Sequence, residues 1–257
     1  MTGTAAPSGR LLLHRNGEAA WNMAMDQAIA EAASEQSLKG ATSAPTLRLY
    51  DWAEPTLSLG YFQKAAESEP RFATTTRVRR STGGGAIVHD RELTYSLVIS
   101  TPLAERGARS DLYAGIHQAI IDAISDHGFS ARPFRHDPQP DWPSEKDFLC
   151  FRRRTDEDLV TNGYKIVGSA QRRHRGAILQ HGSVLLEASP LAPELPGLWN
   201  LSSNRITFEW LADSLARKVS TFLDCELEPA ETTSWEQQRA QLIEQSRFDS
   251  EDWFHRR

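Results

Sequence analysis

Three consecutive glycines interrupt the stretch RRSTGGGAIVHD, which spans residues 79–90. Glycine loses more backbone freedom on ordering than any other residue type, so a turn alone would need only one. A glycine run lets a ligand approach the backbone, and its N–H groups can surround a carboxyl, phosphate or carbonyl oxygen. The stretch is neither a Walker A motif nor a dinucleotide-binding fingerprint, because it lacks Gly-Lys-Ser/Thr and a helix-opening G-x-G-x-x-G. The flanking Arg79, Arg80, His89 and Asp90 favour a ligand-binding loop over a simple glycine hairpin.

A cysteine and a lysine further along the chain are also candidate site residues. Cys150 lies in FLCFRRR, and a cysteine thiolate is a strong nucleophile. Lys165 lies just after Asn162-Gly163, a strong signal for a two-residue hairpin. Each has a simpler interpretation: Cys150 packs between two phenylalanines, and Lys165 is solvated near a hairpin tip. Spacing alone does not choose between these interpretations.

The sequence leaves the role of His181 open and assigns Cys225 to packing. His181 in LQHGS either orients a ligand or packs and hydrogen-bonds in the interior. Cys225 in FLDCELE has no comparable context, and we expect it to be structural. The chain has only two cysteines and no paired spacing, so neither a disulfide framework nor a metal site is expected.

The composition is that of an ordinary globular protein, with 257 residues of which 39% are hydrophobic and 25% charged. No apolar run approaches about eighteen residues and the N-terminal MTGTAAPSGR does not resemble a signal peptide, so we expect a cytoplasmic protein that neither crosses nor binds a membrane. The net charge of −5 does not suggest nucleic-acid binding. Basic blocks at 77–80, 152–154 and 172–175 would attract an acidic partner if they shared one face, and solvated surface charge is the alternative.

Hydrophobic periodicity predicts helices before, within and after a set of strands. Helical spacing extends over 18–36, over 112–124 with Asp111 as cap and Gly128 as stop, over 208–222 and over 234–246. Strand-like segments, whose short connections favour antiparallel pairing, are 46–52, 56–62, 86–90 and 93–100. The Asn162-Gly163 turn joins two more strands, and 176–186 is expected to be a strand broken by a glycine. This order predicts an α+β domain.

Two segments are expected to lack regular structure. Residues 1–9 are predicted to be disordered, as chain ends often are. Residues 136–147 contain three prolines and many charges, which exclude a regular helix or strand.

Five segments, in this order, resemble the lipoate-protein ligase and octanoyltransferase superfamily, which is related to the biotin protein ligases. They are WNMAMDQA (21–28), LRLYDWAEPTLSLGYFQ (47–63), RRSTGGGAIVHD (79–90), NGYKIVGSAQRR (162–173) and GAILQHGSVLL (176–186). The resemblance implies one catalytic domain over 10–257 with a helical tail from about 206 to 257. It also implies a mixed, mainly antiparallel sheet flanked by helices, and a tunnel for an eight-carbon acyl chain.

The resemblance further implies roles for individual residues. One branch of octanoyltransferases uses a cysteine in a Cys-Phe pair fifteen residues before the family lysine, and here Cys150-Phe151 stands fifteen residues before Lys165. The branch usually has Pro-Ser and an aromatic residue after that pair, whereas this chain has RRRTDED (152–158). Cys150 and Lys165 are therefore the expected catalytic residues. The expected substrate-binding residues are Arg79, Arg80, Gly83, Gly84, Gly85, Ala86, His89, Gly168, Ser169, Ala170, His181 and Gly182.

The implied function is transfer of an octanoyl or lipoyl group from a carrier-protein thioester to a lysine of a lipoyl domain through a cysteine thioester. No cofactor and no metal are expected. The donor is octanoyl-acyl carrier protein or a modified lipoyl domain, and the acceptor is the apo lipoyl domain of the glycine cleavage H protein or a 2-oxoacid dehydrogenase E2. One alternative is a lipoate-protein ligase that uses ATP and magnesium to form an acyl-adenylate. Another is a non-catalytic module that binds acylated carriers.

Overall fold

A computed structural model of the chain describes residues 8–100, 107–137 and 147–257. Within these residues, eight strands form a main sheet in the order β11-β1-β2-β6-β10-β9-β8-β7. β11, β1 and β2 run parallel to one another, whereas each later neighbouring pair is antiparallel. The predicted mixed, mainly antiparallel sheet is confirmed. In sheet order the strands span Glu226–Pro229, Ser8–Gly17, Thr46–Trp52, Glu92–Ser100, Ala177–Leu185, Tyr164–His174, Leu159–Thr161 and Arg132–Pro133.

A smaller sheet supports the glycine loop. It has the order β4-β3-β5, with bounds Thr76–Arg79, Thr56–Leu59 and Ile87–His89. β4 is parallel to β3, and β5 is antiparallel to it. The loop at 80–86 therefore connects the two outer strands of this sheet.

The prediction that short connections pair consecutive strands was wrong for β2 and β3. Only three residues separate these strands, yet they lie in different sheets. Leu57 and Leu59 of β3 pack in a separate apolar cluster with Phe72, whereas Leu47 and Leu49 of β2 pack in the main core. The burial of these side chains, which is a tertiary effect, overrides the local preference for a hairpin.

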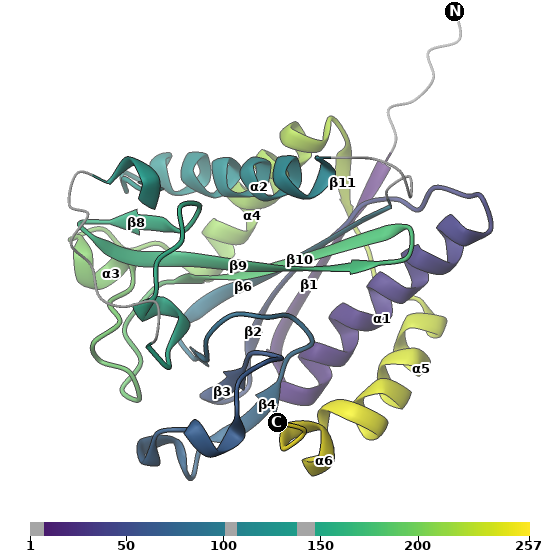
Figure 1. Cartoon of the computed structure of the whole chain (residues 1–257). Coiled ribbons are helices and arrows are strands. Elements are labelled where there is room, and N and C mark those ends of the chain that lie inside the picture. The colour runs from purple at the N-terminus through teal and green to yellow at the C-terminus, as the bar shows by residue number, and fades with distance from the viewer. Residues whose placement is uncertain (1–7, 101–106, 138–146) are drawn as a thin grey trace, which may run out of the picture.

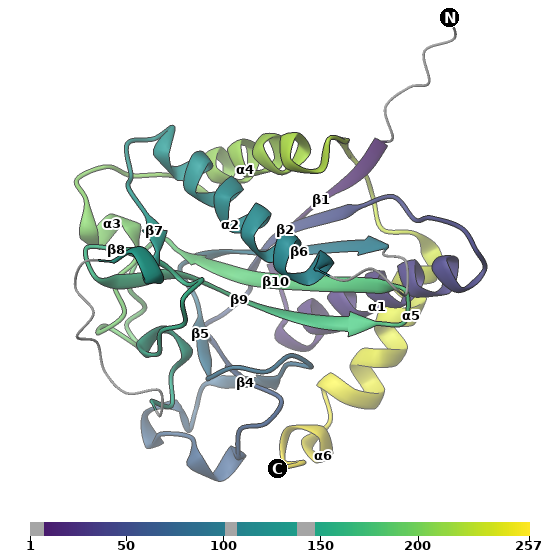
Figure 2. The same ribbon diagram turned by 45° about the horizontal axis from the view of Figure 1, so that its top comes forward.

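Helices cover both faces of the main sheet. α1 (Ala19–Leu38) and α5 (Ser234–Ile243) lie on one face, and α2 (Ala108–Ser125) and α4 (Phe208–Leu223) lie on the other, as Figures 1 and 2 show. The side chains of β2 alternate accordingly: Leu47 and Leu49 pack with α2 and α4, while Tyr50 and Trp52 pack with α1. The sheet is thus buried on both faces, and the helices predicted at 18–36 and 208–222 are confirmed.

The N-terminus of α2 differs from the prediction, whereas its C-terminus agrees with it. Gly107 occupies the N-cap position, and Asp111 lies inside the first turn, where a carboxylate favours the positive end of the helix dipole. The helix ends before Asp126, two residues ahead of Gly128. Gly128 has a positive φ of 80°, and the N–H groups of Gly128 and Phe129 donate to the carbonyls of Ser125 and Ile124 at 2.9 and 3.1 Å, so Gly128 is the predicted stop.

Two strand predictions near the site have different outcomes. Asn162 and Gly163, with φ of 50° and 80°, form the predicted turn between β8 and β9. β10 runs without a break through Gly182, which pairs with Tyr95 of β6 and Ser169 of β9, so the expected interruption is absent.

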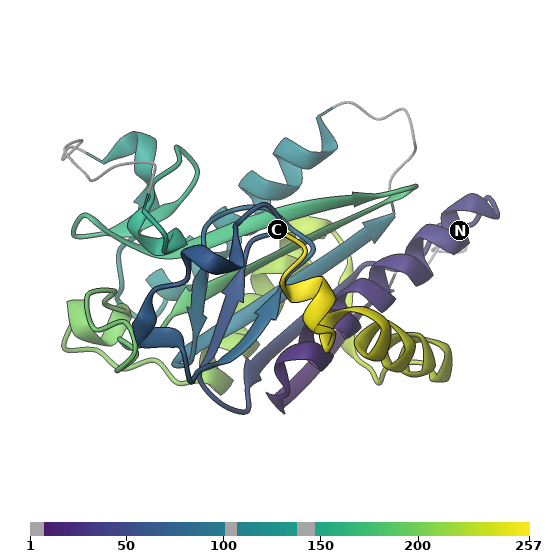
Figure 3. The same ribbon diagram turned by 60° about the horizontal axis from the view of Figure 1, so that its bottom comes forward.

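The segment 206–257 is not wholly helical. It contains β11, which pairs in parallel with β1 and completes the main sheet. After α5 the chain continues as a π-helix (Glu244–Phe248) and as α6 (Glu251–Phe254). Figure 3 shows α5 lying beside α1 and α6 leading back toward the smaller sheet.

The remaining elements are short. They are α3 (Leu198–Leu201) and four 3-10 turns at Ala65–Glu67, Pro70–Phe72, Phe134–His136 and Cys150–Arg152. Ser8 and Gly9 belong to β1, so the predicted disorder does not extend to them; residues 1–7 and most of the predicted irregular segment 136–147 lie outside the described residues. In the described part of the chain, no helix has the length and apolarity needed to span a membrane.

Candidate active site

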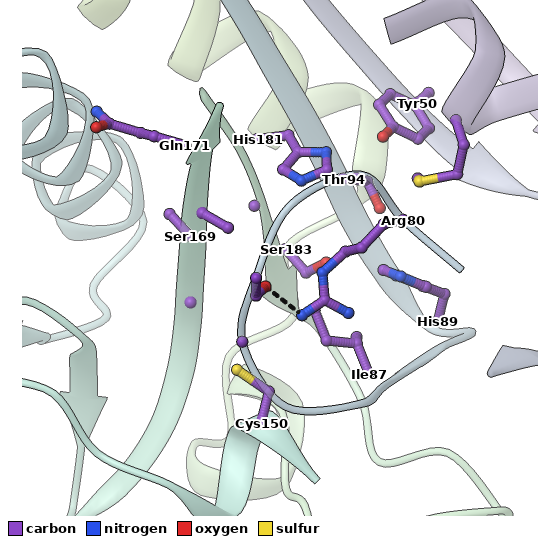
Figure 4. A pocket seen from close by; sticks show the side chains of 16 residues that line it. Tyr50, Arg80, Ile87, His89, Thr94, Cys150, Ser169, Gln171, His181 and Ser183 are labelled. Atoms are coloured by element: carbon purple, nitrogen blue, oxygen red, sulfur yellow. Dashed lines mark hydrogen bonds between the residues drawn. The ribbon is translucent and has the colours of Figure 1, made fainter. Parts of the chain in front are cut away.

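A cavity of about 230 Å³ lies between the main sheet and the glycine loop. β9 and β10 contribute one wall, and the loop contributes the opposite one (Figure 4). Ten of the lining residues were predicted from the sequence: Arg80, Gly83, Gly84, His89, Cys150, Gly168, Ser169, Ala170, His181 and Gly182. Six others were not: Met23, Tyr50, Ile87, Thr94, Gln171 and Ser183.

Arg80 holds the glycine loop from its buried side. Arg80 is 2% exposed, and its guanidinium donates to the carbonyls of Ser58, Gly83 and Gly85 at 3.0, 2.8 and 2.7 Å. Figure 4 labels Arg80 and marks with a dashed line a hydrogen bond from its guanidinium. Burial lowers the pKa of Arg80 to about 10, so the group is still a cation at neutral pH. The loop is therefore fixed in shape by its own arginine.

Arg79 has a different position from the one predicted. It is fully buried but does not line the cavity. Its guanidinium donates to the carbonyls of Gly60, Gln63 and Phe254 at 2.9, 2.7 and 2.8 Å. Arg79 thus ties the smaller sheet to α6.

Cys150 lies directly against the glycine loop. Its backbone N–H donates to the carbonyl of Ala86 at 2.7 Å, and the N–H of Ala86 donates to the carbonyl of Phe148 at 2.9 Å. A Cβ on Gly85 would lie 2.9 Å from the Cys150 backbone, so only glycine permits this approach. The thiol itself is half-buried and lines the cavity, and Figure 4 shows its sulfur pointing toward the space between the loop and Ser169.

Lys165 is buried beside Cys150. Its Nζ lies 3.6 Å from Cys150 Sγ, donates to the Cys150 carbonyl at 3.4 Å and forms an ion pair with Asp158 Oδ2 at 2.8 Å. The interpretation as a solvated hairpin-tip lysine was wrong, because Lys165 is only 4% exposed. The tip is formed by Asn162 and Gly163, and the strand turns the Lys165 side chain inward toward the cysteine.

Gly168 leaves space for the lysine side chain. A Cβ there would lie 2.6 Å from Lys165 Cε and 3.0 Å from Nζ. Gly168, expected as a substrate-binding residue, is thus also the residue on β9 that gives the Lys165 side chain its room.

His181 connects the loop to the sheet. Its Nε2 lies 2.7 Å from the hydroxyl of Thr82, and its Nδ1 lies 3.3 Å from Asp26 Oδ2. Asp26 also pairs with Arg48 at 2.8 Å and accepts from the Tyr50 hydroxyl at 2.9 Å. Burial opposes ionisation of Asp26, but the contacts with His181 and Arg48 hold the pKa of its carboxyl below its usual value. His181 therefore orients the loop through a buried, ionised network.

His89 is held by a second carboxylate. Its Nδ1 lies 2.7 Å from Glu92 Oε1, and its ring stacks on Trp52 with centroids 4.0 Å apart and an interplanar angle of 15°. Ser183 donates to the same Glu92 oxygen at 2.8 Å. Among the described residues, His89 Nε2 has no hydrogen-bond partner, although His89 lines the cavity.

The model of the lipoyl protein ligase A/B catalytic domain matches residues 18–205. This chain belongs to that family. Octanoyltransferase LipM from Kyrpidia tusciae is 34% identical to this lipoyl protein ligase A/B chain and aligns over 96% of it and 98% of the relative. Octanoyltransferase LipM from Geobacillus kaustophilus is 31% identical, over 93% of this chain and 94% of the relative.

Solved structures share the fold of this lipoyl protein ligase A/B domain. A putative lipoate protein ligase from T. acidophilum has a TM-score of 0.79 and 22% identity, covering 97% of this chain and all of that chain. A lipoate-protein ligase A bound with ATP has a TM-score of 0.78 and 23% identity, covering 96% of this chain and 98% of that chain. At these identities the likeness concerns architecture alone.

The basic blocks of this lipoyl protein ligase A/B domain are only partly on its surface. Arg79 and Arg80 of the first block are buried. Arg172 of the third block and Arg256 flank the Tyr61 ring, at 5.9 and 4.1 Å from its centroid. Neither a shared basic face nor solvated surface charge therefore describes the whole of the first block, because its last two arginines satisfy backbone carbonyls.

Asp158, which contacts Lys165 beside Cys150, was not among the residues predicted from the sequence. It follows the 152–157 segment and stands seven positions before Lys165, across the hairpin. A bulge between Leu159 and Val160 shifts the register of β8 against β9, so simple alternation does not predict which side chains meet. Among the residues that the structure describes, no cluster of His, Cys, Asp and Glu is arranged to hold a metal ion.

Proposed function

We propose that this protein is an octanoyltransferase of protein lipoylation in which Cys150 carries the acyl group. One observation carries the proposal: the Cys150 thiol lines a cavity while a buried lysine lies 3.6 Å from its sulfur. A thiolate beside a cation is the arrangement expected of a reactive cysteine. The curated relatives that bear the name octanoyltransferase support the assignment over nearly the whole chain.

The first half-reaction exchanges one thioester for another. The Cys150 thiolate attacks the carbonyl carbon of an octanoyl thioester on a carrier protein, and a new C–S bond forms as the old one breaks. The carrier leaves as a thiolate and takes up the proton that Cys150 lost. Because both thioesters have similar free energies, the exchange requires no ATP.

The second half-reaction moves the acyl group to an amine. The neutral amine of a lipoyl-domain lysine attacks the Cys150 thioester, a C–N bond forms, and the cysteine leaves as a thiolate. The proton that the amine loses restores the thiol or passes to solvent. The amide product is more stable than the thioester, and this difference drives transfer forward.

Lys165 and the glycine loop supply the electrostatic part. The ammonium of Lys165 and the N–H groups of residues 83–85 would donate to the oxygen of each tetrahedral intermediate. A donor of this kind is worth about 3–4 kcal/mol in the transition state. Ser169, Ala170, Gly182 and His181 would bound the acyl chain as walls of the cavity.

The partners in this proposal are proteins. The donor is octanoyl-acyl carrier protein or an octanoylated lipoyl domain. The acceptor is the apo lipoyl domain of a glycine cleavage H protein or a 2-oxoacid dehydrogenase E2. No cofactor takes part in either half-reaction as written.

The experiment that tests the proposal uses the full chain without nucleotide. The protein is mixed with octanoyl-acyl carrier protein and examined by intact mass, and an apo lipoyl domain is then added. We expect an octanoyl adduct that neutral hydroxylamine removes and the acceptor lysine consumes. If octanoylation instead requires ATP, magnesium and free octanoate, the protein is a lipoate-protein ligase. If acylated carrier binds without any transfer, it is a binding module.

A further inference from the structure

A buried carboxylate contacts the lysine that faces the candidate nucleophile. Asp158 Oδ2 lies 2.8 Å from Lys165 Nζ, and both side chains are 3% exposed. Ion pairs of exposed side chains contribute little, but a buried pair leaves a costly unpaired charge when one partner is removed. The position of Lys165 therefore depends on Asp158.

The local backbone fixes Asp158 before Lys165 is considered. The N–H of Thr155 donates to Asp158 Oδ2 at 2.7 Å, and the N–H of Asp158 donates back to the Thr155 carbonyl at 3.0 Å. The Asp158 carbonyl accepts from the N–H of Phe134 at 2.8 Å, which ties this turn to the neighbouring β7 segment. Hydrogen bonds within its own turn and to the edge of the sheet therefore fix the position of Asp158.

The three hydrogens of the lysine ammonium have three acceptors in the structure. They are Asp158 Oδ2 at 2.8 Å, the Cys150 carbonyl at 3.4 Å and Cys150 Sγ at 3.6 Å. The shortest contact is the one to Asp158, which anchors the group.

A second cavity offers the lysine another position. It measures about 280 Å³, and Lys165 forms part of its wall. Glu194 also lines this cavity, but it already pairs with Arg71 at 2.6 Å. Without Asp158, the Lys165 side chain has room to turn away from Cys150 toward this space, although Arg152 and Arg154 also line it.

We propose that Asp158 is a positioning residue that holds the Lys165 ammonium against Cys150, so that Lys165 acts as a fixed cation rather than as a proton acceptor. The inference rests on the proposed function for its role in catalysis. The reactivity of the Cys150 thiol also depends on Asp158 through Lys165, and this dependence requires no acyl substrate.

The test measures alkylation of Cys150 by iodoacetamide, resolved from Cys225 by peptide mass. We expect Asp158→Asn and Lys165→Met each to slow alkylation by about tenfold, the factor that corresponds to one charge-assisted hydrogen bond. Asp156→Asn makes the same chemical change at an exposed position two residues away and should alkylate at the wild-type rate.

The double variant Asp158→Asn/Lys165→Met separates positioning from a general effect of charge. If Asp158 acts through Lys165, the double variant is no slower than Lys165→Met alone. If alkylation of the double variant is slowed by the product of the two single-variant factors, the proposal is overturned. A wild-type alkylation rate in a folded Asp158→Asn protein also overturns it. Should Asp158→Asn fail to fold, Asp158→Glu retains the carboxylate and must recover part of the rate relative to Lys165→Met; no recovery also overturns it.

Turnover then connects the inference to catalysis. Asp158→Asn should lower kcat for octanoyl transfer by about 100-fold, a typical cost of displacing a catalytic group by about 1 Å, with little change in donor KM. A rise of the same size in the donor KM, with kcat unchanged, would contradict positioning. If the alkylation pattern holds but no variant, wild type included, transfers octanoate, the proposed function fails and the dependence of Cys150 on Asp158 stands.

Discussion

At the scale of single residues, Cys150 and Cys225 provide a matched pair of thiols. Cys150 lines the cavity beside Lys165, whereas Cys225 is buried between α4 and β11, where burial raises the pKa of its thiol. We expect Cys150→Ala to abolish both the octanoyl adduct and turnover, while Cys225→Ala retains both. Intact mass before and after hydroxylamine measures the adduct. Full transfer by Cys150→Ala would show that the acyl group never rests on this cysteine.

Lys165 should matter for stability as well as for catalysis. Lys165→Ala removes the ammonium beside Cys150, so turnover should fall by about 100-fold or more. It also leaves the Asp158 carboxylate buried without its ion pair, which should cost about 3 kcal/mol of unfolding free energy. A hairpin-tip lysine would have cost almost nothing, so urea unfolding distinguishes the buried pair from the solvated lysine. Near-normal turnover in a folded variant would remove Lys165 from the mechanism.

At the scale of elements, the glycine loop gives a comparison between two neighbouring positions. A Cβ on Gly85 would lie 2.9 Å from the Cys150 Cα and N, whereas a Cβ on Gly83 would meet only the Phe62 ring at 3.8 Å. Gly85→Ala should therefore lower the unfolding free energy by about 1–3 kcal/mol, because backbone must move. Gly83→Ala should stay within about 0.5 kcal/mol of wild type. Equal stabilities of the two variants, measured by urea unfolding, would contradict this packing.

At the scale of the whole molecule, a buried histidine makes stability depend on pH. His117 is 3% exposed, its Nδ1 donates to the Glu157 carbonyl at 2.7 Å, and its Nε2 lies 2.7 Å from the Ser169 hydroxyl. Burial lowers the pKa of His117 to about 4 from 6.5. Between these values the unfolded chain binds more protons than the folded one, so the unfolding free energy falls as the pH falls from 6.5 toward 4.

The expected loss from His117 is on the order of 2–3 kcal/mol between pH 7 and 4.5. Urea unfolding at both pH values measures it, and His117→Gln should reduce the difference. Some dependence should remain in that variant, because burial and Arg48 also lower the pKa of His14 to about 4. An unchanged difference in His117→Gln would show that His117 does not contribute.

The sequence by itself determined the parts of the protein that depend on local chemistry. The glycine run needs a close backbone approach, Asn162-Gly163 needs positive φ, and apolar spacing sets the helices at 18–36 and 208–222; each is a property of neighbouring residues. The Cys150 to Lys165 spacing was informative for the same reason, since the intervening turn and hairpin bring the two side chains together.

Only the tertiary structure decided which residues meet across the fold. The separation of β2 from β3 depends on which apolar cluster each strand joins, and the pairing of β11 with β1 joins segments more than 200 residues apart. The burial of Arg79 and the contact of Asp158 with Lys165 are likewise set by packing and by a β-bulge. A charged residue looks the same in the sequence whether it is solvated or buried. The free-energy cost of burying it is offset only by partners that folding brings close.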